Sequence, residues 1–169
     1  MRREDFGEAS CTVARTMDII GDPWTPLVLR DVALGISRFD AVQANLGISR
    51  KVLTQRLQAL VDHEVVERIA YQERPVRYDY VLTAKGQDLA LVLLAIQSFG
   101  DKWLMPGQEP LIWHHLTCDH DTSPQISCRH CGGELRPGEA VPRRGPGFAE
   151  DEWPAVGAAL DAVAPFLER

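Results

Sequence analysis

The sequence lacks any uninterrupted run of about 18 apolar residues, the length that a membrane-spanning helix needs. Its first residues, MRREDFGEAS, carry charge without a following apolar segment, so no signal peptide is predicted and the cytoplasm is the expected location. Phosphate-binding loops, dinucleotide fingerprints and the G-x-S-x-G motif are also missing, which argues against an enzyme. Apolar residues still make up 45% of the chain, enough for a folded core.

An excess of positive charge is missing as well, since the net charge is −6. The acidic residues are unevenly spread, however. Residues 1–104 contain 13 Lys and Arg against 14 Asp and Glu, whereas residues 105–169 contain 5 against 10. The nearly neutral first part can therefore present a local basic face, and a nucleic-acid partner stays open for it.

Helical periodicity and turn residues predict an ordered series of elements in the first 104 residues. Four short helices are expected, with Ser37 and Asp40 forming a capping box, Gly47 in a tight turn and Ser49 capping the fourth helix, which runs to about His63. Two β-branched segments then predict a hairpin over 65–82, and a long apolar helix over 84–104 follows. This helix is too apolar to be covered on one side alone, so it needs a second partner surface.

Two helices joined by a glycine turn and followed by a hairpin are typical of a winged helix-turn-helix. The predicted fold is thus mainly α with a small β-hairpin wing, plus a small C-terminal extension. A rotation of about 100° per residue places Leu53, Leu57 and Leu60 on one side of the fourth helix, with Arg56 at the border. The candidate DNA-binding residues are those of the opposite arc, its border and the hairpin tip: Ser49, Arg50, Lys51, Thr54, Gln55, Arg56, Gln58, Arg74 and Arg77.

The segments IIGDPWTPLVLRD, RFDAVQ, ISRKVLTQRLQAL, VVER and YVLTAKG, together with Cys11, resemble the HxlR-type winged-helix transcription regulators. The resemblance implies a homodimer that uses the first helix and the long helix as its interface and binds two-fold related operator DNA. Relatives commonly have Gly-Lys-Trp where this chain has Asp22-Pro23-Trp24, which removes one possible phosphate contact.

Two other functions stay open on the sequence alone. The polar arc can be an ordinary solvated helix face, and winged helices can also serve as protein-interaction modules. The remaining alternative is a redox or metal sensor. Its output would be DNA binding, or its winged helix would contact a protein partner.

Cys11 stands apart from the other cysteines, near a predicted helix start and one turn before Arg15. A helix N-terminus and a nearby cation both favour a reactive thiolate. Some members of the resembled family sense thiol-reactive small molecules at this position, so Cys11 is a candidate redox-sensing residue. A cysteine that only fills core space is the alternative.

The segment HHLTCDHDTSPQISCRHCGGEL contains the other three cysteines. In a reducing compartment such a cluster indicates a metal or redox site rather than a disulfide framework. The expected zinc ligands are Cys118, His120, Cys128 and Cys131, with His115 as the alternative histidine. Four ligands leave no open position, so the zinc would be structural, although a disulfide or a site without metal is also open.

A change in composition after residue 105, where Pro and Gly become frequent, divides the sequence. We expect a DNA-binding and dimerisation domain over 1–105, a zinc-ribbon-like extension over 106–147, and a tail with a short helix over 148–169.

Overall fold

The computed structural model describes residue 7, residues 9–151 and residues 153–163. The chain divides into two units, one formed by residues 16–124 and the other by the described residues outside that range. Within the described residues, no helix is both long and apolar enough to cross a membrane.

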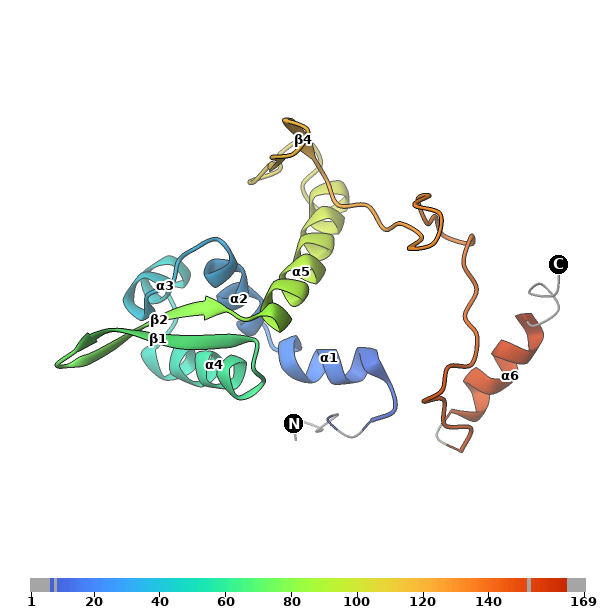
Figure 1. Ribbon diagram of the computed structural model, residues 1–169, viewed down its shortest axis with the longest axis horizontal. Coiled ribbons are helices and arrows are strands. Elements are labelled where there is room, and N and C mark those ends of the chain that lie inside the picture. The colour runs from blue at the N-terminus through green and yellow to red at the C-terminus, as the bar shows by residue number, and fades with distance from the viewer. Residues whose placement is uncertain (1–6, 8, 152, 164–169) are drawn as a thin grey trace. The chain divides into compact units, whose positions relative to one another are not determined.

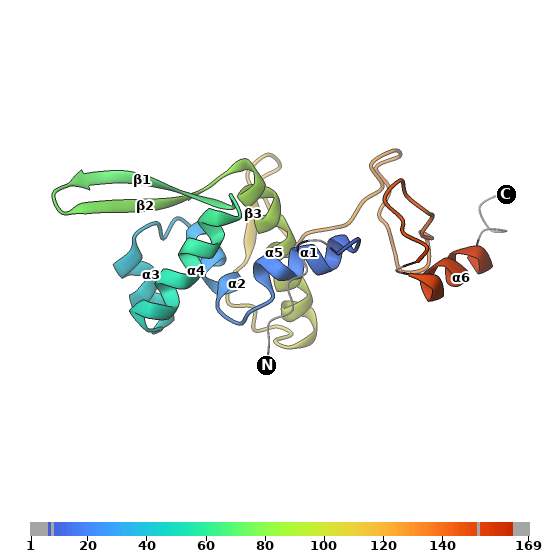
Figure 2. The same cartoon turned by 90° about the horizontal axis from the view of Figure 1, so that it is seen from below.

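Helices dominate the larger unit, and one long hairpin accompanies them (Figure 1). After α1 (Thr12–Ile20), the elements follow in the order α2 (Thr25–Ala33), α3 (Phe39–Leu46), α4 (Arg50–Asp62), β1 (Val66–Glu73), β2 (Val76–Leu82), α5 (Ala84–Trp103), β3 (Trp113–His115) and β4 (His120–Thr122). In both views the β1–β2 hairpin projects past α3 and α4, as the wing of a winged helix does (Figure 1 and Figure 2).

The core lies where α2, α4, the base of the hairpin and α5 meet. It is built from aliphatic side chains, among them Val28, Leu29, Val42, Ile48, Leu53, Leu57, Leu60, Val65, Val66 and Leu89. Leu34, at the C-cap of α2, is 44% exposed.

The turn between α3 and α4 forms as the sequence predicts. Gly47 adopts a left-handed conformation with φ 63°, which favours glycine because it has no Cβ. Ser49 then caps α4 by accepting a hydrogen bond from the N–H of Val52 at 3.3 Å.

The predicted capping box of Ser37 and Asp40 is wrong. Arg38 is the N-cap residue of α3, and its side chain makes no capping hydrogen bond. The Ser37 hydroxyl instead donates to the carboxylate of Asp79 on β2, at 2.7 Å. The same contact region holds an isolated β-bridge between Arg38 and Asp79, which ties the start of α3 to the wing.

The wing is an antiparallel pair within the predicted range, and its strands continue up to the turn at Arg74 and Pro75. Its register shifts between Ala70 and Gln72. Thr83 caps α5 by accepting from the N–H of Gly86, and Gly86 packs so closely against the Val65 carbonyl that a Cβ would lie 2.1 Å from its oxygen.

The other unit includes a short helix, α6 (Pro154–Val163), close to the short helix that the sequence predicts. Arg144 organises it, since its guanidinium bonds Glu150 at 2.8 Å and Asp161 at 2.6 Å. Phe148 and Trp153 pack edge to face. Pro165, which the sequence places near the helix end, lies outside the described residues.

Candidate nucleic-acid interface

Helix α4 separates its side chains as the helical rotation predicts. Leu53, Leu57 and Leu60 are fully buried. Six of the predicted DNA-binding residues are exposed on the other side: Ser49, Arg50, Lys51, Thr54, Gln55 and Gln58. No carboxylate of α4 lies among them before Asp62, which accepts a hydrogen bond from Gln58 at 2.7 Å. The exposed arc can therefore donate to base edges and phosphates without internal repulsion from its own helix.

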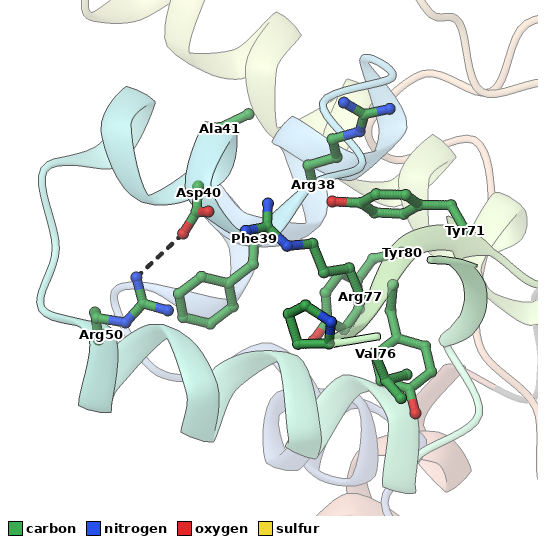
Figure 3. A pocket seen from close by; sticks show the side chains of 11 residues that line it. Arg38, Phe39, Asp40, Ala41, Arg50, Tyr71, Val76, Arg77 and Tyr80 are labelled. Atoms are coloured by element: carbon green, nitrogen blue, oxygen red, sulfur yellow. Dashed lines mark hydrogen bonds and ion pairs between the residues drawn. The ribbon is translucent and has the colours of Figure 1, made fainter. Parts of the chain in front are cut away.

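Arg50 is held at the start of α4 by side chains of α3 (Figure 3). One guanidinium nitrogen lies 3.1 Å from the Asp40 carboxylate, and the group stacks 4.8 Å from the centroid of the Phe39 ring. Both partners of the ion pair are about 70% exposed. The contact thus orients Arg50 while leaving it open to an anionic ligand.

Arg38 belongs to the same surface, although the sequence analysis did not select it. Its guanidinium stacks 4.6 Å from the Tyr71 ring centroid and lies 3.6 Å from Asp79. The residues around it line a groove of about 490 Å³ between α3, the start of α4 and the wing. Arg38, Arg50 and Arg77 all line this groove (Figure 3). Only the long-range pairing of Arg38 with β2 places it there, so sequence spacing gave no indication of it.

Arg56 differs from the other predicted residues because it is largely covered. Its side chain is 23% exposed, and its Nε lies 3.1 Å from the Asp22 carboxylate, which is 15% exposed. The angle is not that of a hydrogen bond, and this nitrogen has no hydrogen-bond partner among the described residues. We treat the contact as an ion pair that joins α4 to the segment before α2.

Asp22 explains why that segment can receive a cation. Its carboxylate accepts from the N–H groups of Trp24 and Thr25 and from the Thr25 hydroxyl. Burial acts to raise the pKa of Asp22, but these hydrogen bonds and the Arg56 charge lower it below its usual value. Helix α2 begins at Thr25, and Asp22 accepts from the N–H groups of its N-cap residue and its first residue.

The wing tip carries the two remaining predicted residues. Arg74 and Arg77 are both exposed, and Arg74 lies in the turn between the strands. The Gln72 amide donates to the carbonyl of Arg74 at 3.1 Å, which helps to close the turn.

Cys11 lies immediately before α1 and is half-buried. Its sulfur accepts from the N–H of Ala14 at 3.4 Å, so it occupies the N-terminal position that the sequence predicts. Arg15 does not pair with the sulfur here; its Nε donates to the carbonyl of Ala9.

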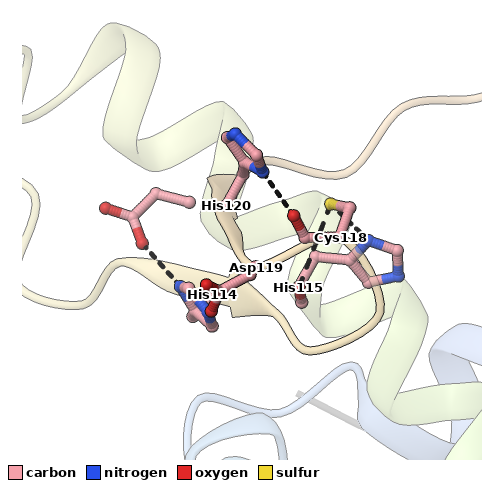
Figure 4. Close-up of polar contacts among 6 residues, drawn as sticks. His114, His115, Cys118, Asp119 and His120 are labelled. Atoms are coloured by element: carbon pink, nitrogen blue, oxygen red, sulfur yellow. Dashed lines mark hydrogen bonds and ion pairs between the residues drawn. The ribbon is translucent and has the colours of Figure 1, made fainter.

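The candidate metal ligands lie on two separate turns. One joins β3 to β4 and holds Cys118, with its sulfur 3.1 Å from Nδ1 of His115 (Figure 4). The other holds Cys128 and Cys131, where the N–H groups of Cys131 and His130 point at the Cys128 sulfur and lower the pKa of that thiol. No three His, Cys, Asp or Glu side chains come together as a metal site within the described part of the chain. All four cysteines are free thiols.

Comparison with known proteins decides the family. A model described as HxlR-like helix-turn-helix matches residues 19–108, more than half of the chain. This chain belongs to that family. The assignment agrees with the resemblance and with the winged-helix geometry described above.

Several relatives are named as regulators. The uncharacterized HTH-type transcriptional regulator Rv3095 of Mycobacterium tuberculosis is 36% identical over 138 residues, which cover 81% of this chain and 87% of Rv3095. The crystal structure of PA1607, described as a candidate transcription factor, gives a TM-score of 0.74 at 30% identity, covering 84% of this chain and 100% of PA1607. The redox regulator HypR, in its reduced form, gives 0.50 at 25% identity, covering 56% of this chain and 97% of HypR.

These findings establish the HxlR-like protein as a DNA-binding transcription regulator with a helix-turn-helix. The family and its relatives are regulators rather than enzymes, in agreement with the sequence analysis.

Proposed function

We propose that the HxlR-like protein reads operator DNA through the exposed arc of α4 inserted in the major groove. The observation that carries this proposal is the division of α4 into three buried leucines and an exposed arc of cationic and amide side chains. Arg50 and Lys51 would bind guanine or phosphate, and Gln55 would pair with adenine. The positive end of the α4 dipole lies at Ser49 and adds to the attraction for phosphate.

The groove between α3 and the wing would receive the DNA backbone beside the major groove. Arg38 and Arg77 supply its positive charge, and Arg74 extends the surface to the wing tip. Stacking of Arg38 on Tyr71 fixes the guanidinium before binding, so less side-chain entropy is lost on contact with a phosphate. In this proposal Arg56 does not touch DNA, because it is covered and paired with Asp22.

A homodimer on two-fold related DNA is the proposed assembly. Helix α5 exposes a stripe of Val92, Ile96, Phe99 and Trp103, spaced so that they share one face, whereas Leu89, one turn before Val92 on the same side, is buried in the core. Exposed apolar residues also occur on α1, at Val13 and Met17. A two-fold axis would present two copies of α4 to successive major grooves, about 34 Å apart.

The assembly and the DNA site are testable together. Fluorescence anisotropy with the promoter DNA next to the protein's own gene, against a shuffled duplex, measures specific binding. Hydroxyl-radical footprinting on the same duplex then locates the contacts. We expect two protected patches on one face of the DNA, centred about 10 bp apart. Equal affinity for both duplexes, or one isolated patch, would contradict the proposal.

We further propose that Cys11 makes the regulator responsive to a thiol-reactive small molecule. The half-buried sulfur lies at the N-terminal end of α1, where it accepts a hydrogen bond from the N–H of Ala14. The similarity to HypR, named as a redox regulator, adds support. Treatment with diamide or a quinone should release DNA from the wild-type protein and leave the Cys11→Ser variant bound. Equal release from both proteins would assign the sensing elsewhere.

Finally, we propose that the extension after residue 105 binds a structural zinc ion. The support is the Cys128-x-x-Cys131-Gly-Gly sequence, the free state of all the thiols and the scarcity of buried side chains in residues 106–147. A bound ion would supply folding energy that so polar a segment lacks.

A further inference from the structure

The turn between β3 and β4 has a definite backbone pattern. The carbonyl of His115 accepts from the N–H of Asp119, four residues later, at 2.9 Å. Asp119 adopts a left-handed conformation with φ 57°, which is uncommon for a residue with a Cβ. His115 pairs across the strands with His120, five residues later.

The turn that holds the other two cysteines repeats this pattern position by position. The carbonyl of Cys128 accepts from the N–H of Gly132, four residues later, at 2.8 Å. Gly132 is also left-handed, with φ 72°. The N–H of Cys128 donates to the carbonyl of Gly133, five residues later, at 2.7 Å.

Matching the two turns pairs His115 with Cys128, Cys118 with Cys131, and His120 with Gly133. We infer that His115, and not His120, is the fourth zinc ligand, so that each turn supplies two ligands three residues apart. This inference rests on the proposed zinc binding and refines it. The two turns belong to different units, and their match concerns the backbone within each turn alone.

The donor atoms of the first turn support the assignment. Nδ1 of His115 lies 3.1 Å from the Cys118 sulfur, close to the separation of about 3.5 Å that two ligands of one tetrahedral zinc would have. His120 instead directs its Nδ1 to the backbone carbonyl of Cys118 (Figure 4). Its counterpart in the second turn is Gly133, a position that carries no ligand atom at all.

The two histidines must still be separated by experiment, because a zinc-bound histidine often donates its other nitrogen to a carbonyl. The full chain is purified under reducing conditions, and its zinc content is measured by mass spectrometry. Zinc affinity is then measured by competition with a chromophoric chelator. The variants are His115→Ala, the matched control His120→Ala, and His115→Cys, which replaces the imidazole with another zinc ligand. Far-UV circular dichroism checks that the helices of each variant remain folded.

We expect one zinc ion per wild-type chain and unchanged affinity in His120→Ala. His115→Ala should bind zinc more than about 100-fold more weakly, since losing even a group that only orients a ligand costs about 10–100-fold. His115→Cys should recover most of the affinity, and its cobalt spectrum should gain thiolate-to-metal absorption. Weakening in His120→Ala alone, or in neither alanine variant, would overturn the assignment to His115 while leaving zinc binding in place. If the reduced wild-type chain does not bind zinc, the proposed zinc binding and the assignment to His115 are both wrong. The DNA-binding proposal is tested separately by the anisotropy assay.

Discussion

The Arg56→Ala substitution tests whether Arg56, which is largely covered and paired with Asp22, stabilises the fold or contacts DNA. If Arg56 joins α4 to the segment before α2, its loss should lower stability and leave the number of phosphate contacts unchanged. If it contacts DNA, its loss should do the reverse. The ion pair with Asp22, at 3.1 Å, predicts the first outcome.

The magnitude follows from the exposure of the pair. Exposed ion pairs contribute about 0.2–1 kcal/mol, and breaking a buried pair costs about 3–5 kcal/mol. With side chains 23% and 15% exposed, Arg56 and Asp22 fall between these limits. Because the Nε lacks hydrogen-bond geometry and Asp22 keeps its bonds to Thr25, we expect a loss of about 1–2 kcal/mol in the free energy of unfolding.

Two measurements on the same protein test this reasoning. Urea denaturation gives the loss of stability, and the double variant with Asp22→Asn should show that the two losses are not additive. The slope of log affinity against log salt gives the phosphate contacts, at about 0.9 for each one. Undiminished stability together with a slope reduced by about 0.9 per subunit would refute the reasoning and return Arg56 to the DNA surface.

Three further predictions follow from the described contacts. Phe99→Glu should weaken self-association by about 10²–10⁴-fold, since burying a phenylalanine contributes about 1.5–3 kcal/mol per copy. Analytical ultracentrifugation measures the effect, with Gln87→Glu on the same helix as the control. An unchanged dimer in Phe99→Glu would contradict the proposed interface. Arg38→Ala should reduce the salt slope of DNA binding by about 0.9 per subunit with stability nearly kept, and an unchanged slope would exclude Arg38 from the interface. The pKa of Asp22 is lower in the folded than in the unfolded protein, so ionised Asp22 stabilises the fold at pH values above the unfolded pKa. This stabilisation is lost as the pH falls through the lower, folded pKa. Wild-type protein should therefore lose more stability than Asp22→Asn between pH 6 and acid below about pH 4, and parallel losses in urea melts would argue against that role.

The helices and the wing follow from the sequence because local rules determine them. Gly47 and Ser49 fix the turn before α4 by their own backbone and side-chain preferences. The leucine spacing of α4 then decides which face is buried, and the structure bears this out.

The structure adds to the sequence where a distant partner overrides a local preference. Ser37 could cap α3, but Asp79 lies 42 residues away and takes its hydroxyl. Arg56 lies at the border of the α4 arc by rotation alone, and only the folded position of Asp22 covers it. Arg38 becomes part of the groove through its pairing with β2, which no spacing in the sequence indicates.

The β3 and β4 strands were also missed, since three residues each, rich in histidine and acid, give no recognisable alternation. Their turn nevertheless supplies the backbone comparison on which the proposed assignment to His115 rests. The sequence alone leaves His115 and His120 open as ligands, and only the backbone conformation of the turn offers a ground for choosing between them.

The central claim is that the exposed arc of α4 contacts DNA, and the affinities of Arg50→Ala and Lys51→Ala for the promoter duplex test it most directly. Arg143→Ala, an exposed cation outside the winged helix, is the matched control. We expect each α4 variant to bind at least about 10-fold more weakly, with unchanged urea denaturation, because a good contact to a base is worth about 1–3 kcal/mol. Wild-type affinity in both α4 variants would contradict the account.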